Sequence, residues 1–224
     1  MAIRLAVFDM AGTSVADKGD VIVFFQKAFA ENGIVIDKSD LQPVRGLKKL
    51  SAVRIILENL NIETNTGLIE KIHRDFISQI TDYYRTSSEV EPAAGAEDIF
   101  SWLKQKKIRI ALNTGFTRPI ADLIVNRFQW QQRGLVDEYI SSDEVEEGRP
   151  YPYMIRKLMK NAGLQNPGEV MKIGDTPVDI EEGRNAGCGL VIGITTGASS
   201  RILLEKSDPD YIIDNLSELK TLIK

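Results

Sequence analysis

Short apolar runs recur along the chain, and most are followed by a stretch of helical periodicity. The first run, residues 3–8, holds Ile, Leu, Ala, Val and Phe with one Arg, which is typical of a strand buried on both faces. Strands that alternate with helices in this way predict an α/β fold with a doubly wound parallel sheet. Further buried strands are predicted at residues 108–112, 135–140, 170–173, 190–194 and 211–213.

The segment between the first two strands has a different pattern and contains no predicted strand. Its apolar residues recur at helical spacing, and the second helical region is interrupted near Pro43 and Gly46. The pattern divides the chain into an α/β core of residues 1–14 and 87–224 and an all-helical insert of residues 15–86. Within the insert, helical regions are predicted at residues 21–29, 40–59 and 66–85.

Composition and charge narrow the class of protein. The 224 residues, 43% hydrophobic and 27% charged, suit a globular protein with one large α/β domain and a modest insert. A net charge of −4 without a Lys/Arg block argues against nucleic-acid binding, and no apolar run reaches the ~18 residues of a membrane span. The single histidine, His73, argues against a multi-histidine metal site. One cysteine, Cys188, and no signal peptide ahead of the first strand predict a cytoplasmic protein.

Carboxylates follow two of the predicted strands. Asp9 follows the first strand, and Asp175 and Asp179 follow the strand at residues 170–173. Because the carboxyl ends of parallel strands meet at one edge of a sheet, where ligands bind, we expect these side chains to lie close together. Carboxylate oxygens that converge on one point suit Mg²⁺, which prefers hard oxygen ligands.

Small and hydroxyl-bearing residues at the same edge suit the oxygens of a phosphoryl group. Gly12 and Thr13 lie just after the first strand, and Thr114 and Gly115 follow the next one. Backbone amides and hydroxyls there can donate to phosphoryl oxygens, and a glycine lets the backbone turn sharply beside a ligand. Arg149 would supply a fixed positive charge that holds a nucleophilic aspartate and the phosphoryl group together.

The order of these residues resembles that of the haloacid dehalogenase superfamily of aspartyl phosphotransferases. The resemblance covers the whole chain and implies a Rossmann-like core. It also implies that the helical insert is a mobile cap. It rests on Asp9, Thr114, Arg149, Asp175 and Asp179.

The resemblance also implies roles for individual residues. Asp9 would be the nucleophile that accepts the phosphoryl group as an aspartyl phosphate. Thr114 and Arg149 would bind the phosphoryl oxygens. A Mg²⁺ ion would be held by a set of four residues, with the last binding through water or positioning a ligand: Asp9, the Ala11 carbonyl, Asp175 and Asp179.

Ala11 departs from the superfamily's pattern. Its phosphatases usually carry a second aspartate at this position, which acts as general acid and base because an alkoxide is a poor leaving group. Ala11 has no carboxyl group. Either the acid comes from elsewhere, for which Asp17 and Asp20 are the nearby candidates, or the leaving group needs no proton.

A narrower resemblance agrees with a leaving group that needs no proton. Residues 9–13, 113–118 and 148–154 are similar to segments of the phosphonatases, which are phosphonoacetaldehyde hydrolases. In that family a cap lysine forms a Schiff base with the substrate aldehyde, and cleavage of the C–P bond releases an enamine instead of an alkoxide. Residues 46–54 resemble the segment that carries this lysine and place Lys49 at its position.

Two interpretations of Lys49 remain open. A Schiff-base lysine must be partly deprotonated through burial or neighbouring positive charge, which Lys48 and Arg54 are placed to supply. The alternative is the solvated, basic start of a helix.

Phosphonatases also carry a histidine three residues after the lysine, where this chain has Ala52. The substrate therefore need not be phosphonoacetaldehyde itself.

Three functions remain open on the sequence alone. The first is Mg²⁺-dependent hydrolysis of the C–P bond of a phosphonoacetaldehyde-like substrate through an imine on Lys49. The second is a phosphomonoesterase for a small phosphometabolite, like phosphoglycolate phosphatase, and the third is a non-catalytic binding protein that kept the fold. We expect a small phosphorylated or phosphonate metabolite as partner, no nucleic acid or membrane, and a monomer or homodimer.

Overall fold

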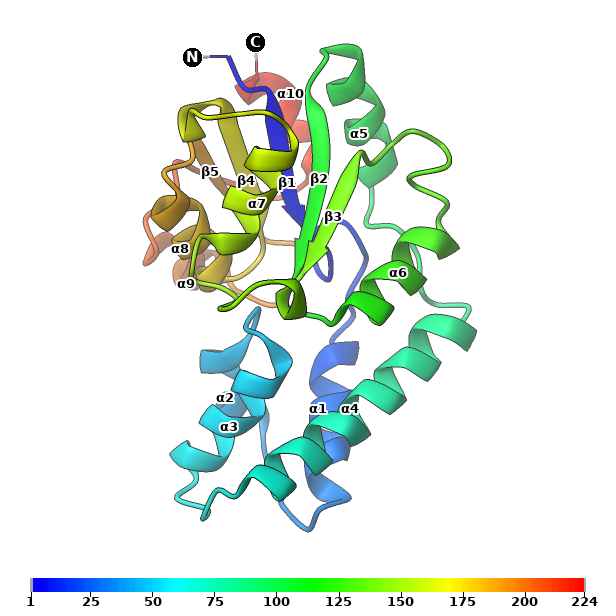
Figure 1. Ribbon diagram of the computed structural model, residues 1–224, viewed down its shortest axis with the longest axis vertical. Coiled ribbons are helices and arrows are strands. Elements are labelled where there is room, and N and C mark those ends of the chain that lie inside the picture. The colour runs from blue at the N-terminus through cyan, green and yellow to red at the C-terminus, as the bar shows by residue number, and fades with distance from the viewer. Residues whose placement is uncertain (1, 224) are drawn as a thin grey trace.

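Six parallel strands form one sheet in the computed structural model, which describes residues 2–223 (Figure 1). The strands are β1 (Leu5–Asp9), β2 (Arg109–Thr114), β3 (Glu138–Ser141), β4 (Val170–Gly174), β5 (Leu190–Ile194) and β6 (Tyr211–Ile213). Their order is β3-β2-β1-β4-β5-β6, and every neighbouring pair is parallel. The winding direction reverses between β1 and β4, and doubly wound folds bind ligands beyond the strand ends at such a point.

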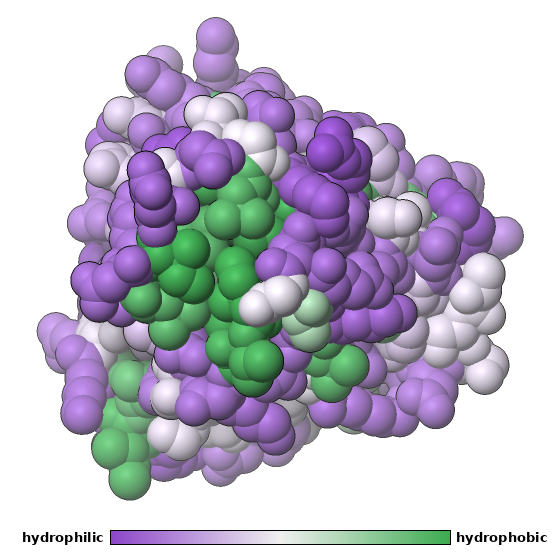
Figure 2. Space-filling view, turned by 90° about the horizontal axis from the view of Figure 1, so that it is seen from below, coloured by the Kyte–Doolittle hydropathy of each residue, from purple (hydrophilic) through white to green (hydrophobic). Residues whose placement is uncertain are grey.

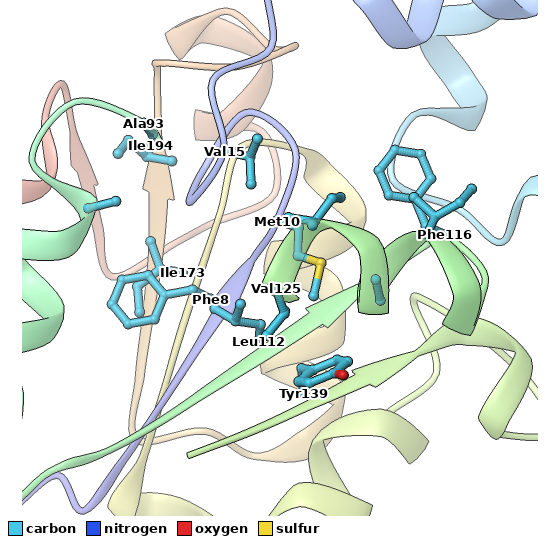
Figure 3. Packing of buried hydrophobic residues seen from close by; sticks show 14 of the residues in the cluster. Phe8, Met10, Val15, Ala93, Leu112, Phe116, Val125, Tyr139, Ile173 and Ile194 are labelled. Atoms are coloured by element: carbon cyan, nitrogen blue, oxygen red, sulfur yellow. The ribbon is translucent and has the colours of Figure 1, made fainter. Parts of the chain in front are cut away.

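Helices cover both faces of the sheet, so β1 is buried on both sides. Leu5 and Val7 belong to one hydrophobic cluster, whereas Ala6 and Phe8 belong to the other. Figure 3 shows Phe8 in the cluster that it shares with Ala6. The ring centroid of Phe8 lies 5.1 Å from that of Phe100. The flanking helices are α5 (Ala96–Gln105) and α6 (Arg118–Arg127) against one face and α7 (Tyr153–Asn161), α8 (Pro177–Ala186) and α9 (Arg201–Glu205) against the other.

An all-helical cap is inserted after β1 and lies beyond the carboxyl ends of the strands (Figure 1). Phe25 stacks on Phe76 between its first and last helices, with ring centroids 4.2 Å apart. Its helices are α1 (Asp20–Ala30), α2 (Lys38–Leu41), α3 (Lys49–Asn59) and α4 (Thr66–Thr86). The fold is therefore an α/β core with a doubly wound parallel sheet and an inserted helical cap, as expected.

Some element boundaries differ from the predicted ones. The helical region predicted at residues 40–59 is three pieces, since a short 3-10 turn at Gln42–Val44 and the left-handed Gly46 separate α2 from α3. The strand predicted at residues 135–140 begins only at Glu138. The closing helix predicted at residues 216–223 is a 3-10 turn at Leu216–Glu218 followed by α10 (Leu219–Leu222).

The far side of the cap is partly apolar. Figure 2 looks at the molecule from below and shows hydrophobic side chains gathered on this face. Val35 of the cap is 89% exposed. None of the helices within residues 2–223 has the length and apolar character needed to cross a membrane.

Candidate active site

A pocket lies between the carboxyl edge of the sheet and the cap. Seven of the residues expected at the site line it, while Gly12, Thr13 and Asp179 do not. The cap also contributes Phe25 and Arg45 to its wall. The seven expected residues are Asp9, Ala11, Lys49, Thr114, Gly115, Arg149 and Asp175.

Asp9 ends β1 and faces a buried guanidinium. Its Oδ1 lies 2.7 Å from Nη1 of Arg149, and both side chains are almost inaccessible to solvent. Burial raises the pKa of Asp9, while the charge of Arg149 opposes that rise. Backbone pairing of Asp9 with Asn113 of β2 fixes where the carboxylate leaves the sheet. Asp9 is therefore a carboxylate held in place beside a permanent positive charge.

Arg149 is anchored on every side. Its Nη2 donates to both the backbone carbonyl and the side-chain oxygen of Asn113, each at 2.8 Å. Its Nε donates to Glu182 at 3.1 Å, and its Nη1 lies 3.0 Å from Asp179. A planar guanidinium held at all its nitrogens cannot turn away, so it presents a fixed charge to the pocket.

A buried network behind Arg149 was not predicted from the sequence. Lys172 lies in the middle of β4, and its Nζ lies 2.8 Å from Asp179 and 3.6 Å from Glu182. It also donates to Asn113 Oδ1 at 2.8 Å. The sequence does contain a signal for it, because a lysine within an apolar strand is almost never buried without a partner. The network fixes Asp179, whose other oxygen accepts from the backbone amide of Thr176.

Carboxylate oxygens of Asp9, Asp175 and Asp179 lie within 4.8 Å of one another and could together hold a metal ion. Within the described residues, no cationic side chain pairs with Asp175, which accepts from the amide of Ala198 at 2.6 Å and the hydroxyl of Thr13 at 3.3 Å. Burial and the charges of Asp9 and Asp179 raise the pKa of Asp175 well above its usual range. Such crowding of carboxylates is what a divalent cation relieves.

The charge balance of the buried cluster also fits Mg²⁺. Two negative charges remain when all its groups are ionised, and a divalent cation neutralises them. Ala11 lines the same pocket, and within residues 2–223 its carbonyl accepts no backbone hydrogen bond. Asp179 is already paired with Arg149 and Lys172. It is therefore better placed to hold these two cations in position than to bind the metal ion directly. The cluster comprises the carboxylates of Asp9, Asp175, Asp179 and Glu182 and the cations Arg149 and Lys172.

Added Mg²⁺ is expected to raise the thermal unfolding midpoint. At a concentration 100 times its Kd, the ion would stabilise the fold by about 2.7 kcal/mol, which corresponds to about 5–10 °C for a chain of this length. Differential scanning calorimetry of wild type and Asp175→Asn, with and without Mg²⁺, checks this. The shift should be lost in Asp175→Asn and kept in Asp82→Asn, since Asp82 is an exposed residue of α4. An equal shift in Asp175→Asn would contradict the proposed ion site.

Two glycines permit close approaches around the pocket. A Cβ on Gly12, whose φ is +90°, would lie 2.6 Å from Oδ2 of Asp175. A Cβ on Gly115 would lie 2.5 Å from the carbonyl oxygen of Leu47 in the cap. Both distances are shorter than any real Cβ contact allows. Gly12 therefore lets the loop after β1 approach Asp175, and Gly115 lets the cap close on the core.

Lys49 is buried, so the interpretation as a solvated helix start is wrong. It begins α3 with 7% of its surface exposed, and its Nζ lies 5.1 Å from the ring centroid of Phe116 and 5.9 Å from that of Phe25. No carboxylate within residues 2–223 lies at ion-pair distance from it. Burial lowers the pKa of Lys49 to about 8. About a tenth of the amine is therefore neutral at pH 7.

The residues around Lys49 give it no histidine partner on its own helix. Ala52 is fully buried in the core of the cap. His73 on α4 is the one histidine in the sequence. Its Nε2 is buried and has no hydrogen-bond partner in the described part of the chain. Burial together with the charge of Lys49 lowers the pKa of His73.

Asp17 and Asp20 are the two acids suggested to replace the one missing at Ala11, and of these only Asp17 lines the pocket. Its Oδ1 accepts from the backbone amides of Gly19 at 2.9 Å and Asp20 at 2.8 Å. Burial raises the pKa of Asp17. The side chain of Asp20 instead accepts from the amide of Lys18. The pocket thus contains a carboxyl group from the start of the cap, although Ala11 itself provides none.

Comparisons with known proteins agree with this architecture. A phosphonoacetaldehyde hydrolase of Bacillus mycoides is 30% identical over 236 residues, which cover 98% of this chain and 84% of that protein. The crystal structure of a phosphonoacetaldehyde hydrolase-like protein from Oleispira antarctica superposes with a TM-score of 0.88 at 20% identity, covering 100% of this chain and 92% of that one. A "predicted phosphoglycolate phosphatase" from Haemophilus somnus superposes with a TM-score of 0.83 at 19% identity, covering 99% and 98%.

The family itself follows from a match along most of the chain. The family model of the haloacid dehalogenase-like hydrolases matches residues 6–192, a span that contains Asp9, Thr114, Arg149 and Asp175. All four of these residues line the pocket. The chain therefore belongs to the haloacid dehalogenase-like hydrolase family.

Proposed function

We propose that the protein hydrolyses the C–P bond of a small phosphonate that carries a carbonyl group on the carbon next to the phosphonate-bearing carbon, as phosphonoacetaldehyde does. The observation that carries this proposal is Lys49, a buried lysine in the same pocket as Asp9 that forms no ion pair within residues 2–223. A phosphatase needs no amine in this place, whereas an imine-forming enzyme does. The relationship to phosphonoacetaldehyde hydrolases supports the same assignment.

The first step joins the substrate carbonyl to the cap. The neutral amine of Lys49 attacks the carbonyl carbon, and loss of water leaves a protonated imine. Phe25 and Phe116 flank the amine and keep this side of the pocket apolar, which favours the neutral lysine before attack. The positive imine nitrogen can then accept electrons from the adjacent carbon.

The second step breaks the C–P bond. A carboxylate oxygen of Asp9 attacks phosphorus, and the electron pair of the C–P bond moves toward the imine to give an enamine. Arg149 holds Asp9 in line and offsets charge on the phosphoryl group. Because the enamine is a neutral leaving group, the absence of a carboxyl group at Ala11 is no obstacle. The enamine carbon then takes up a proton from solvent to give an imine again. One water hydrolyses this imine and releases the carbonyl product from Lys49, and another releases phosphate from Asp9.

The remaining expected residues have supporting roles. Mg²⁺ would be held by Asp9, Asp175 and the Ala11 carbonyl, and when bound it would neutralise charge on the phosphoryl oxygens. Thr114 would donate its hydroxyl to a phosphoryl oxygen, since it lines the pocket at the end of β2. Residues 15–86 would move as the cap, because closure onto Gly115 must reverse to admit substrate.

The activity assay that tests this proposal uses three substrates with Mg²⁺. Phosphonoacetaldehyde should yield acetaldehyde and inorganic phosphate in equal amounts. Phosphoglycolate and p-nitrophenyl phosphate should be hydrolysed at least about 100-fold less efficiently, because neither forms an imine. Efficient hydrolysis of the esters without any acetaldehyde from the phosphonate would overturn the proposal.

A phosphomonoesterase remains the second candidate, and Asp17 is the observation in its favour. A carboxyl group with a raised pKa in the pocket can protonate an alkoxide leaving group. In that case Asp17→Asn should abolish activity on the ester while Lys49→Met leaves it largely intact. C–P hydrolysis through an imine predicts a dominant effect of Lys49→Met on the phosphonate.

The pH dependence of C–P cleavage should follow the neutral fraction of Lys49. Burial and the charge of Arg149 lower the pKa of Lys49, while the charges of Asp9, Asp17 and Asp175 raise it, with a net value of about 8. Because only the neutral amine attacks, kcat/KM for phosphonoacetaldehyde should rise roughly tenfold per pH unit below this value and level off above it. A pH–rate profile measured from pH 6 to 9.5 checks this, and a flat profile would contradict imine formation by Lys49.

A further inference from the structure

Arg45 places an unpaired positive charge in the wall of the pocket. It follows the 3-10 turn at Gln42–Val44 and precedes Gly46, and it lines the same pocket as Lys49. No carboxylate within the described residues lies at ion-pair distance from its guanidinium, and its Nε is buried without a hydrogen-bond partner. A guanidinium keeps its charge at every physiological pH. An unpaired buried guanidinium nitrogen is costly unless a ligand completes it.

The other cations of the pocket are already assigned. Arg149 is held by Asp9, Asp179 and Glu182, and Lys49 lies between aromatic rings. Arg45 therefore carries a positive charge that no carboxylate of the described chain neutralises.

The position of Arg45 is fixed by contacts between its segment of the cap and the core. Its Nη1 donates to the backbone carbonyl of Ala198 in the core, across the seam between cap and core. A Cβ on the neighbouring Gly46, whose φ is +78°, would lie 2.5 Å from Oγ1 of Thr176. This close approach seats the segment against the core whenever the cap is closed. The guanidinium is thus held in place before any ligand arrives, which lowers the entropic cost of binding an anion.

We infer that the substrate carries a carboxylate on its carbonyl carbon, and that Arg45 binds this carboxylate. The inference rests on the proposed C–P hydrolysis and names its substrate class: a 2-oxo acid with a phosphonate on the carbon next to the carbonyl. Asp9 and Arg149 take the phosphonate end, and Lys49 takes the carbonyl. Arg45, in the same cap segment four residues before Lys49, is left to take the carboxylate.

The reaction of such a substrate balances with water alone. The amine of Lys49 replaces the keto oxygen, which leaves as water. Asp9 takes the phosphoryl group, the electron pair of the C–P bond forms the enamine, and the enamine carbon takes up a proton from solvent. One water then hydrolyses the imine and another the aspartyl phosphate. The net products are a 2-oxo acid with a methyl group and inorganic phosphate.

The test compares two phosphonates on the wild-type enzyme and on Arg45→Met. The probes are 3-phosphonopyruvate, which has the carboxylate, and phosphonoacetaldehyde, which lacks it. Wild type should have the higher kcat/KM for 3-phosphonopyruvate. In Arg45→Met the ratio of the two kcat/KM values should fall about 10- to 100-fold, as expected when a charge-assisted hydrogen bond is lost.

A matched control separates carboxylate binding from a general effect of charge. Lys48→Met removes a cation from the same segment, and Lys48 does not line the pocket, so its substrate ratio should match that of wild type. Arg45→Lys keeps the charge without the planar guanidinium and should give an intermediate ratio. An unchanged ratio in Arg45→Met would show that Arg45 only ties the cap to Ala198, and would overturn the inference.

The inference and the proposed function fail differently. If phosphonoacetaldehyde is hydrolysed and wild type prefers it to 3-phosphonopyruvate, the inference is wrong while C–P hydrolysis stands. If neither phosphonate yields phosphate while a phosphate ester does, the proposed function is wrong and the inference falls with it. The wild-type comparison needs no variant, so it decides the matter even if a substitution at Arg45 impairs folding.

Discussion

Asp9→Asn is expected to lower phosphate release by about 10⁴- to 10⁶-fold, as the loss of a covalent nucleophile does in other enzymes. The reason is local: the carboxylate ends β1 beside Nη1 of Arg149 at 2.7 Å, and an amide cannot form a stable phosphoryl intermediate. The measurement is steady-state phosphate release with phosphonoacetaldehyde and with a phosphate ester. Both substrates should lose activity, because either function uses this nucleophile.

The fold of Asp9→Asn should survive the change. Arg149 keeps its contacts to Asp179, Glu182 and Asn113, so its buried guanidinium still has carboxylate partners. Its thermal midpoint and circular dichroism spectrum should resemble those of wild type. Residual activity within tenfold of wild type, in a folded variant, would show that the phosphoryl group does not pass through Asp9.

Lys49→Met is expected to lower the hydrolysis of phosphonoacetaldehyde by about 10³-fold or more, since the imine can no longer form. Methionine has a similar length and suits the aromatic contacts to Phe25 and Phe116. Lys48→Met serves as the matched control because its side chain lies outside the pocket. The measurement is kcat for acetaldehyde release in the two variants, and equal activity in both would contradict the imine.

Lys49→Met should also be more stable toward unfolding than wild type at pH 7. Burial lowers the pKa of Lys49 from 10.5 in its ordinary state to about 8 in the folded chain, so folding at pH 7 works against a charged amine. Removing that amine should add about 3 kcal/mol to the free energy of unfolding. In wild type the stability due to this group should rise with pH between about 8 and 10.5, because only the unfolded chain stays protonated there. Urea unfolding at pH 7 and pH 9.5 measures both effects.

Most of the core could be predicted because burial on both faces leaves a clear pattern. The strands at residues 190–194 and 211–213 coincide with the apolar runs, and β1 carries alternate residues into two clusters. Short elements left weaker signals. The five-residue α9, Arg201–Glu205, is too short to show a helical period and was not predicted.

The residues at strand ends were the part of the candidate site that the fold pattern itself could predict. Asp9, Thr114 and Asp175 meet at one edge because the sheet is parallel, which the sequence pattern implies. The ion pairs of Lys172 and Glu182 join β4 to α8, and no sequence spacing shows which faces of two elements will meet.

Burial of Lys49 could not be predicted from its neighbours. Lys48 and Arg54 flank it in the sequence, and a basic run of this kind usually marks a solvated face. Whether a lysine at the start of α3 is exposed depends on how the cap closes on the core. The close approach of Leu47 to Gly115 shows this closure, and it exists only in the folded chain.

The most direct test of the account is borohydride trapping of an imine on Lys49. The enzyme is incubated with phosphonoacetaldehyde and sodium borohydride, digested, and its peptides are examined by mass spectrometry. A reduced adduct should appear on the peptide that contains Lys49, with loss of activity in proportion, and Lys49→Met should give none. Continued release of acetaldehyde and phosphate, with Lys49 unmodified under the same conditions, would contradict the account.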